Sequence, residues 1–294
     1  MIEVQDLTYT YPGALAPAVS GVSFSVAPGE VFGLLGPSGA GKTTTQRVLT
    51  RQNRRFRGNV RVLDREMDAW DHTFYERIGV GFELPNHYPR LTGRENLELF
   101  ASLYSGPTRS PDEMLGAVGL GEAAEVRVGE YSKGMQMRLS FVRALLHEPS
   151  VLFLDEPTAG LDPVNGSVLK DLIRAERARG RTILLTTHNM ADVEELCDRV
   201  GFLVAGEMSV VDAPEALKAR YGERSVRVEY VGDGGAPGAA DFPLDGLGRD
   251  QAFLELLNAR PIRSLHSQEA SLNRVFADVT GVRLTNEPVE PGEA

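Results

Sequence analysis

Residues 36–43 read Gly36-Pro37-Ser38-Gly39-Ala40-Gly41-Lys42-Thr43, and they fill every fixed position of the pattern G-x-x-x-x-G-K-[ST]. An apolar run, 31–35, precedes this segment and a helical pattern begins at Lys42, which is the context that the pattern requires. The glycines let backbone N–H groups turn inward around a polyphosphate, and the helix start adds its positive dipole end. We therefore predict a phosphate-binding loop and reject a plain glycine-rich turn.

This loop predicts a site for a nucleoside triphosphate and Mg²⁺. Lys42 would neutralise the β- and γ-phosphates, and the Thr43 hydroxyl would bind the metal ion. The predicted nucleotide contacts are the loop and the residue after it: Gly36, Pro37, Ser38, Gly39, Ala40, Gly41, Lys42, Thr43 and Thr44.

Two carboxylates, Asp155 and Glu156, follow a second apolar run at 151–154. Four apolar residues predict a buried strand, and ligands of open α/β sheets bind at the carboxyl ends of such strands. We expect Asp155 to hold Mg²⁺ through water and Glu156 to accept the proton of an attacking water. A carboxylate pair after a strand can also be a helix cap or a surface turn, but the phosphate-binding loop favours the catalytic interpretation.

The remaining apolar pattern predicts the surrounding fold. Segments 2–11, 22–26 and 59–63 alternate apolar and polar residues, as half-buried strands do. Apolar runs at 151–154 and 182–186 flank a helical segment, which implies a parallel sheet with right-handed crossovers.

Residues from about 90 to 146 have a helical pattern, and Thr92 with Glu95 predicts a capping box. Beyond about residue 221 we expect a strand at 225–231, a loop at 232–240 and a helix at 253–257.

These patterns indicate an α/β fold of the P-loop NTPase class. We expect a mostly parallel core sheet, an antiparallel β subdomain, a helical subdomain at about 85–146 and a small α+β C-terminal extension. The expected domains are a nucleotide-binding domain at 1–220 and an accessory domain at 221–285, followed by a disordered tail at 286–294.

Composition excludes several classes of protein. The net charge of −10 argues against a reader of duplex DNA, which would carry a basic face. The single cysteine, Cys197, excludes an internal disulfide framework and a multi-cysteine zinc site. No apolar run approaches the ~18 residues of a membrane span, and residues 1–6 have no signal-peptide pattern. We expect a water-soluble, cytoplasmic protein.

The segment Tyr131-Ser132-Lys133-Gly134-Met135-Gln136 precedes a helical run at 137–146. Ser132 is a natural helix N-cap, so its hydroxyl and the Gly134 amide would face an anion; a simple cap would account for Ser132 alone. The segment resembles the signature motif of ATP-binding-cassette (ABC) ATPases, in the Y-S-K-G-M form. The resemblance implies that Ser132 and Gly134 of one protomer close over the γ-phosphate of ATP held by the other.

The same resemblance assigns three further residues. Asp162, at the end of the segment 157–162, would cross the dimer interface, and His188, after the strand predicted at 182–187, would contact the γ-phosphate. Tyr11 resembles the aromatic residue that stacks on adenine; Tyr9 is the alternative, and core packing is the alternative role of either. The other histidines are interpreted as solvated surface residues: His72, His87, His147 and His266.

The chain departs from the family pattern at Glu83, where the family normally has glutamine. A carboxylate is a harder oxygen ligand than an amide, so Glu83 is a candidate Mg²⁺ ligand that also senses the γ-phosphate. A solvated loop glutamate is the alternative.

Segments 82–88, 131–138 and 271–281 resemble one subgroup, the drug-export ATP-binding proteins, and most of all the fluoroquinolone-export type. The resemblance implies an ATPase that uses ATP and Mg²⁺ to power efflux of drugs or other small molecules. It implies a separately encoded transmembrane permease and a second copy of the chain as partners, no nucleic acid, and a place on the inner face of the cell membrane. The alternatives are a non-transport ABC ATPase that acts on nucleic acid or ribosomes, and a catalytically silent subunit.

Overall fold

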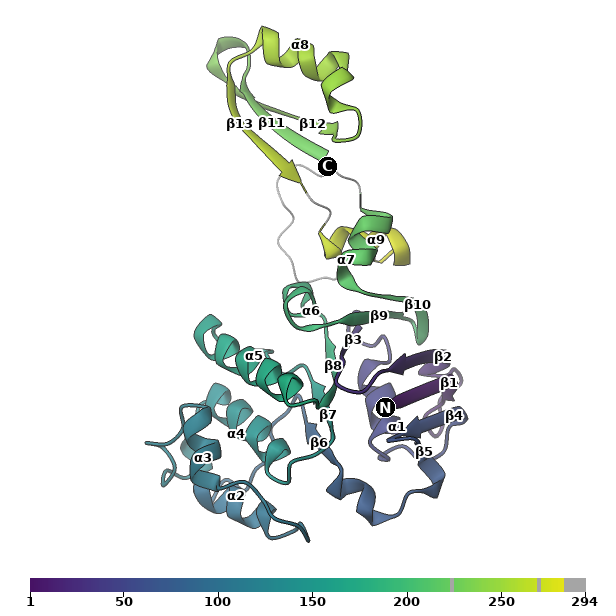
Figure 1. Ribbon diagram of the computed structural model, residues 1–294, viewed down its shortest axis with the longest axis vertical. Coiled ribbons are helices and arrows are strands. Elements are labelled where there is room, and N and C mark those ends of the chain that lie inside the picture. Colours follow the sequence, from purple (N-terminus) through teal and green to yellow (C-terminus); the bar gives the residue numbers. More distant parts are fainter. Residues whose placement is uncertain (223–224, 269–270, 283–294) are drawn as a thin grey trace. The chain divides into compact units, whose positions relative to one another are not determined.

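The computed structural model describes residues 1–222, 225–268 and 271–282, which form two compact units (Figure 1). The first unit contains residues 1–213, and the second begins at Pro214. The boundary between the units therefore lies one helix before the domain boundary expected at residue 220, because α7 (Pro214–Tyr221) belongs to the second unit.

The core of the first unit is a mostly parallel sheet. Its strands are β3 (Val31–Leu35), β6 (Ile78–Gly81), β7 (Val151–Asp155), β8 (Thr182–Thr187), β9 (Arg199–Val204) and β10 (Glu207–Asp212). Their order is β10-β9-β3-β8-β7-β6, and only the β9–β10 pair is antiparallel. Every residue of β3, β7 and β8 is buried, which is why these strands read as continuous apolar runs.

An antiparallel sheet packs beside this core. It has the order β2-β1-β4-β5, with β1 (Ile2–Tyr9), β2 (Val19–Val26), β4 (Arg57–Val62) and β5 (Arg65–Glu66). Val4 and Val60 of this sheet share one apolar cluster with Phe32 of β3 and with Val48 of α1 (Lys42–Leu49). The predicted antiparallel subdomain is confirmed.

Helices cover the other side of the core sheet (Figure 1). They are α2 (Gly93–Ala101), α3 (Pro111–Ala117), α4 (Lys133–Leu145), α5 (Pro163–Ala178) and α6 (Met190–Leu196). Leu97 of α2 and Leu139 of α4 pack in one cluster with Leu152 of β7. The predicted capping box is present, because the Thr92 side chain accepts from the Glu95 amide and the Glu95 side chain accepts from the Thr92 amide.

The second unit contains α7, β11 (Ser225–Val231), β12 (Pro237–Pro243), α8 (Gln251–Ala259), β13 (Ile262–Gln268) and α9 (Leu272–Thr280). The strands form an antiparallel sheet, β12-β11-β13. Phe253 of α8 packs with Val226 and Val228 on one face of it, so the strand and the helix predicted there are confirmed.

The loop predicted at 232–240 is wrong, because β12 begins inside it. Gly238, Ala239 and Ala240 have weak β-propensity, but backbone pairing with β11 holds them in a strand. Pro237 is tolerated because it is the first residue of an edge strand. The tail expected at 286–294 lies outside the described residues. Among the residues described, no helix combines the length and hydrophobicity needed to cross a membrane.

Candidate functional site

Most of the predicted site residues meet in one cleft of about 430 Å³. The segments that follow β3, β7 and β8 contribute to it, so it lies at the carboxyl edge of the core sheet. Its volume suits a nucleotide-sized ligand. The lining residues are Tyr11, Ala18, Ser38, Gly39, Ala40, Gly41, Lys42, Thr43, Thr44, Glu83, Glu156 and His188.

The phosphate-binding loop has the backbone geometry that its glycines predict. A Cβ atom at Gly36 would lie 2.1 Å from the Leu203 carbonyl oxygen, and Gly41 has φ +106°. Gly41 is the N-cap of α1 and offers no side-chain bond to the first helical amides, and the first turn carries no acidic residue. The helix start therefore has N–H groups that suit an anion.

Lys42 is buried at the floor of the cleft. Its Nζ donates to the carbonyl oxygens of Gly36 (2.6 Å) and Pro37 (3.2 Å) and lies 3.8 Å from Glu156 Oε1. Burial lowers the pKa of Lys42, and the carboxylates around it, Glu156 foremost, oppose this shift only in part. The ammonium group is thus held among oxygen atoms next to the loop that would receive the phosphates.

The residues predicted to hold Mg²⁺ adjoin Lys42. The buried Asp155 carboxylate accepts hydrogen bonds through Oδ1 from the hydroxyls of Thr43 (3.3 Å) and Thr186. A carboxylate and a hydroxyl are hard oxygen ligands and fit Mg²⁺, which takes few protein ligands and shares the substrate phosphates. Glu83 is exposed and lines the cleft, and within the part of the chain that the structure describes it makes no hydrogen bond. Thr43, Asp155 and Glu83 are therefore the residues available for the ion.

Glu156 and His188 form a bonded pair in the cleft. Nδ1 of His188 lies 2.8 Å from Oε1 of Glu156. An ionised carboxylate can only accept, so Nδ1 carries a proton in this bond. The Glu156 backbone is in the left-handed region, at φ +47°, and its N–H donates to the Thr186 carbonyl (3.0 Å). Such a conformation is rare for a residue other than glycine and is found at functional sites.

Tyr11 lines the cleft, whereas Tyr9 is buried in the core beneath it. The rings are perpendicular, with centroids 5.0 Å apart, and the Tyr11 hydroxyl is hydrogen-bonded to Thr44 Oγ1 at 3.0 Å. Of the two aromatic candidates, only Tyr11 can contact a ligand in the cleft.

Ser132, Gly134 and Asp162 do not line the cleft. Ser132 caps α4 by accepting from the Met135 amide (3.2 Å). Asp162 caps α5 through bonds from the amides of Val164 and Asn165, and the Asn165 amide holds its pKa below the ordinary value. Both side chains are exposed, so each is free to meet a second chain.

Two residues of the site were not predicted, because nothing in the sequence distinguishes them. Ala18 lines the cleft, but its side chain has no distinctive chemistry. Thr186 holds Asp155 from the neighbouring strand, and the β7–β8 register places them side by side.

Two of the histidines interpreted as solvated are not. His147 is buried, with Nε2 2.8 Å from the Ile78 carbonyl oxygen and its ring stacked on Tyr104. His87 is half-buried, with Nε2 2.9 Å from the Gln136 carbonyl oxygen. Packing by distant segments buries His147 and half-buries His87, and no local sequence pattern predicts this.

Comparisons with known proteins agree with this geometry. A family model described as ABC transporter matches residues 19–159, and one described as fluoroquinolone efflux ABC transporter C-terminal domain matches residues 224–269. A fluoroquinolones export ATP-binding protein of Mycobacterium tuberculosis is 55% identical over 285 residues, which cover 97% of this chain and 95% of that protein. A Nod factor export ATP-binding protein of Burkholderia pseudomallei is 40% identical over 95% of this chain and 97% of its own.

Solved structures give the same result. An ATP-binding subunit of an ABC transporter superposes with a TM-score of 0.68 at 28% identity, covering 75% of this chain and 93% of that one. A dimeric ATP-binding cassette in a post-hydrolysis state with ADP and Pi gives a TM-score of 0.66 at 25% identity, over 72% and 98% of the two chains. With the nucleotide cleft and the relatives in agreement, this chain belongs to the ABC transporter family, as an ATP-binding and ATP-hydrolysing subunit of an exporter.

Proposed function

We propose that this chain powers efflux of a drug or another small molecule by hydrolysing Mg-ATP between two copies of itself, bound to a separately encoded permease. The observation that carries the proposal is the cluster of Lys42, Glu156 and His188 inside a cleft that begins at the phosphate-binding loop. This cluster contains a phosphate-binding cation and a carboxylate base in hydrogen-bond contact with a histidine.

Each residue of the cluster has a role in hydrolysis. The loop amides and Lys42 hold the triphosphate, while Thr43 and Asp155 hold Mg²⁺, which neutralises charge on the phosphate oxygens. Glu156 accepts the proton of the attacking water, and His188 orients the carboxylate through its Nδ1–H. Positioning and charge neutralisation account for most of the rate enhancement in phosphoryl transfer.

The exposed N-terminal ends of α4 and α5 support a head-to-tail dimer. Ser132, Gly134 and Asp162 lie outside their own cleft, so in the proposed dimer they complete the cleft of the second copy. The dimeric cassette with ADP and Pi supports this arrangement.

The permease and the membrane location are part of the same proposal. Exposed apolar residues after β6, namely Phe82, Leu84 and Tyr88, suit a groove that receives a helix of the permease. The named relatives are export proteins, and residues 224–269 match a fluoroquinolone efflux domain. We therefore place the chain on the inner face of the cell membrane and propose fluoroquinolones as the first compounds to test.

The substitution Glu156→Gln tests the catalytic part of the proposal. Glutamine keeps the shape but cannot accept the proton, so hydrolysis should fall by roughly 10²-fold or more. ATP binding should persist, and an ATP-bound dimer should accumulate on size-exclusion chromatography with light scattering. Glu207→Gln, on the exposed edge of β10, is the matched control and should hydrolyse ATP normally. Hydrolysis at the native rate by the Glu156 variant would exclude this residue as the base.

The transport part requires the permease. Cells that express both subunits should accumulate less of a fluorescent fluoroquinolone than cells that express the permease with the Glu156→Gln variant. Equal accumulation would reject this compound class while leaving the ATPase assignment intact.

A further inference from the structure

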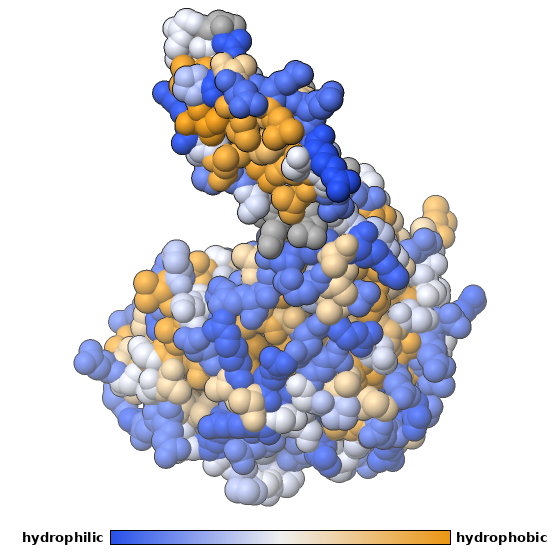
Figure 2. All heavy atoms as spheres, turned by 45° about the horizontal axis from the view of Figure 1, so that its top comes forward, coloured by the Kyte–Doolittle hydropathy of each residue, from blue (hydrophilic) through white to orange (hydrophobic). Residues whose placement is uncertain are grey.

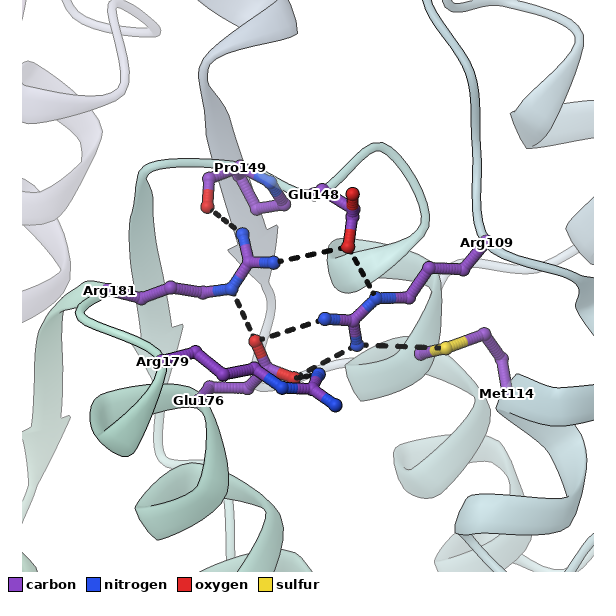
Figure 3. Close-up of polar contacts among 7 residues, drawn as sticks. All are labelled: Arg109, Met114, Glu148, Pro149, Glu176, Arg179 and Arg181. Carbon is purple, nitrogen blue, oxygen red and sulfur yellow. Dashed lines mark hydrogen bonds and ion pairs between the residues drawn. The ribbon is translucent and has the colours of Figure 1, made fainter.

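A network of ion pairs surrounds the buried carboxylate of Glu176 near the end of α5 (Figure 3). The Glu176 side chain is 2% exposed, and it accepts hydrogen bonds from both terminal nitrogens of Arg109, at 2.9 and 3.4 Å. Arg179, the C-cap residue of the same helix, donates to Glu176 Oε1 at 2.8 Å, and Arg181 pairs with Glu176 Oε2. The carboxylate thus faces three guanidinium groups.

Arg109 extends this network to a different part of the fold. It lies between α2 and α3, and its Nε donates to Glu148 at 3.2 Å. Its backbone N–H donates to the carbonyl of Leu146, the C-cap residue of α4, at 2.7 Å. Glu148 lies in the connection from α4 to β7, and Arg181 reaches the Pro149 carbonyl in the same connection. Arg109 therefore fastens the C-terminal end of α4 to α5.

The bonds that Arg109 donates fix the orientation of its guanidinium group. A guanidinium group is planar, and Arg109 uses its Nε and both terminal nitrogens on two different carboxylates, which fixes its orientation. Burial lowers the pKa of Arg109, but the hydrogen bonds that it donates to Glu176 and Glu148, with their negative charges, outweigh burial and raise it. A lysine would carry the charge without the fork geometry.

Because α4 is long, a small change of tilt at its C-terminal end displaces its N-terminal end. α4 has 13 residues and is about 20 Å long. Ser132 caps its N-terminal end, and Gly134 lies in its first turn. A tilt of about 10° at the C-terminal end of a helix of about 20 Å would move the other end by about 3.5 Å, which exceeds the length of a hydrogen bond.

We propose that Arg109 is a positioning residue: by fixing the C-terminal end of α4 against Glu176, it sets where Ser132 and Gly134 meet the nucleotide of the second copy. This inference rests on the proposed function, because it assumes the head-to-tail dimer. Arg109 lies away from the cleft residues and acts on hydrolysis only through α4.

The test uses Arg109→Gln in a chain that also carries Glu156→Gln, in which the ATP-bound dimer accumulates. Binding of a fluorescent ATP analogue to the single chain should be unchanged, because the cleft is intact. The dissociation constant of the ATP-bound dimer should rise by about tenfold or more, since small misplacements far from a reaction centre have effects of this order. In the chain with native Glu156, kcat should fall with little change in KM.

Arg179→Gln is the matched control. It removes a guanidinium group from the same carboxylate, but Arg179 is exposed and lies on the helix of Glu176, so the tie to α4 remains. If the glutamine variant does not fold, Arg109→Lys replaces it in the test. The dissociation constant of the ATP-bound dimer should then rise by about threefold, because one charged bond remains.

The outcomes separate the two proposals. If the Glu156→Gln chain dimerises with ATP and Arg109→Gln or Arg109→Lys weakens the dimer more than Arg179→Gln does, the positioning role is supported. If dimerisation is unchanged, or if the Arg109 and Arg179 variants weaken it equally, the positioning role is overturned and the proposed function stands. If the Glu156→Gln chain itself does not dimerise with ATP, both are overturned.

Discussion

The backbone of Glu156 explains how two consecutive carboxylates serve one cleft. Successive side chains of a strand point to opposite faces, so Asp155 and Glu156 could not both face the cleft if β7 continued unchanged. The strand ends at Asp155, and the left-handed conformation of Glu156 redirects its side chain toward Lys42 and His188. Asp155 meanwhile faces Thr43. One strained residue thus separates the carboxylate proposed to bind the metal ion from the carboxylate proposed as the base.

Glu83 provides a test at the same scale. It adds a negative charge to a cleft that already contains Glu156, and a carboxylate cannot donate a hydrogen bond. Binding of triphosphate beside it should therefore depend strongly on Mg²⁺. We expect Glu83→Gln to bind ATP equally or more tightly without metal and to need more Mg²⁺ for half-maximal hydrolysis.

Titration of Mg²⁺ against phosphate release compares the Glu83→Gln protein with the native chain. Glu98→Gln, on the exposed surface of α2, is the control. Superimposable Mg²⁺ curves for the Glu83 variant and the native chain would show that Glu83 is not a metal ligand.

At the scale of elements, the segment between β6 and α2 is attached to α4 by polar bonds. His87 Nε2 lies 2.9 Å from the Gln136 carbonyl oxygen, and Arg143 donates to the Asn86 carbonyl. Burial and the charge of Arg143 lower the pKa of His87 to about 4, although its bond to the Gln136 carbonyl opposes the shift. The attachment therefore uses a neutral imidazole.

This attachment predicts a pH dependence of stability. An unfolded chain binds the His87 proton near pH 6.5, but the folded chain does not bind it until about pH 4. The unfolded state holds more protons in this window, so stability falls as pH falls, by about 2 kcal/mol between pH 7.5 and 5. His87→Gln should lose this part of the pH dependence.

Urea unfolding at the two pH values measures the difference. The exposed His72→Gln is the control, and its pH dependence should match that of the native chain. An equal loss of stability in the native and His87→Gln proteins would contradict a half-buried, neutral His87.

Prediction from sequence succeeded where a short motif and a local period carry the information. The phosphate-binding loop needs glycines at fixed places, so Gly36 and Gly41 identify it without any knowledge of tertiary contacts. Apolar runs likewise indicate buried strands. By contrast, the burial of His147 depends on Tyr104 and Ile78, which are distant in the chain, and the strand from Pro237 depends on pairing with β11. The roles assigned to the site residues, those of Ser132, Asp162 and Glu83 among them, stay predictions.

At the scale of the molecule, the second unit begins and ends with helices that pack together. α7 and α9 are in contact, and Leu217, Val275 and Phe276 are fully buried. Apolar side chains also gather on one face of this unit (Figure 2), and its residues Leu254 and Leu265 are 39% and 50% exposed. Removal of the whole unit should therefore reduce the apolar surface that the chain exposes. Removal that leaves α7 in place should instead expose Leu217, because α9 is lost.

Two truncated chains test this division. A chain that ends at Ala213 should remain soluble and bind ATP, because the cleft residues all precede that point. A chain that ends at residue 220 should unfold at the same temperature but without a stable α7, since Leu217 would lose its cover from α9 and exposing a leucine costs about 2 kcal/mol. Thermal unfolding with and without ATP makes the comparison. A higher unfolding temperature for the chain that ends at residue 220 would assign α7 to the first unit.

The hydrogen bond between Tyr11 and Thr44 links the aromatic residue of the cleft to the phosphate-binding helix. Burial raises the pKa of the Tyr11 phenol, but its hydrogen bonds, that of Thr44 first, outweigh burial and leave the pKa below its ordinary value. Either hydroxyl of this bond can be the donor, and when Tyr11 donates, the Thr44 proton is left for a phosphate oxygen. Bonds linked in such a chain polarise one another. In its predicted place at the base, Tyr11 would then strengthen binding of the phosphates, so the cleft should bind intact nucleotides more tightly than tripolyphosphate through a relay of two hydroxyls.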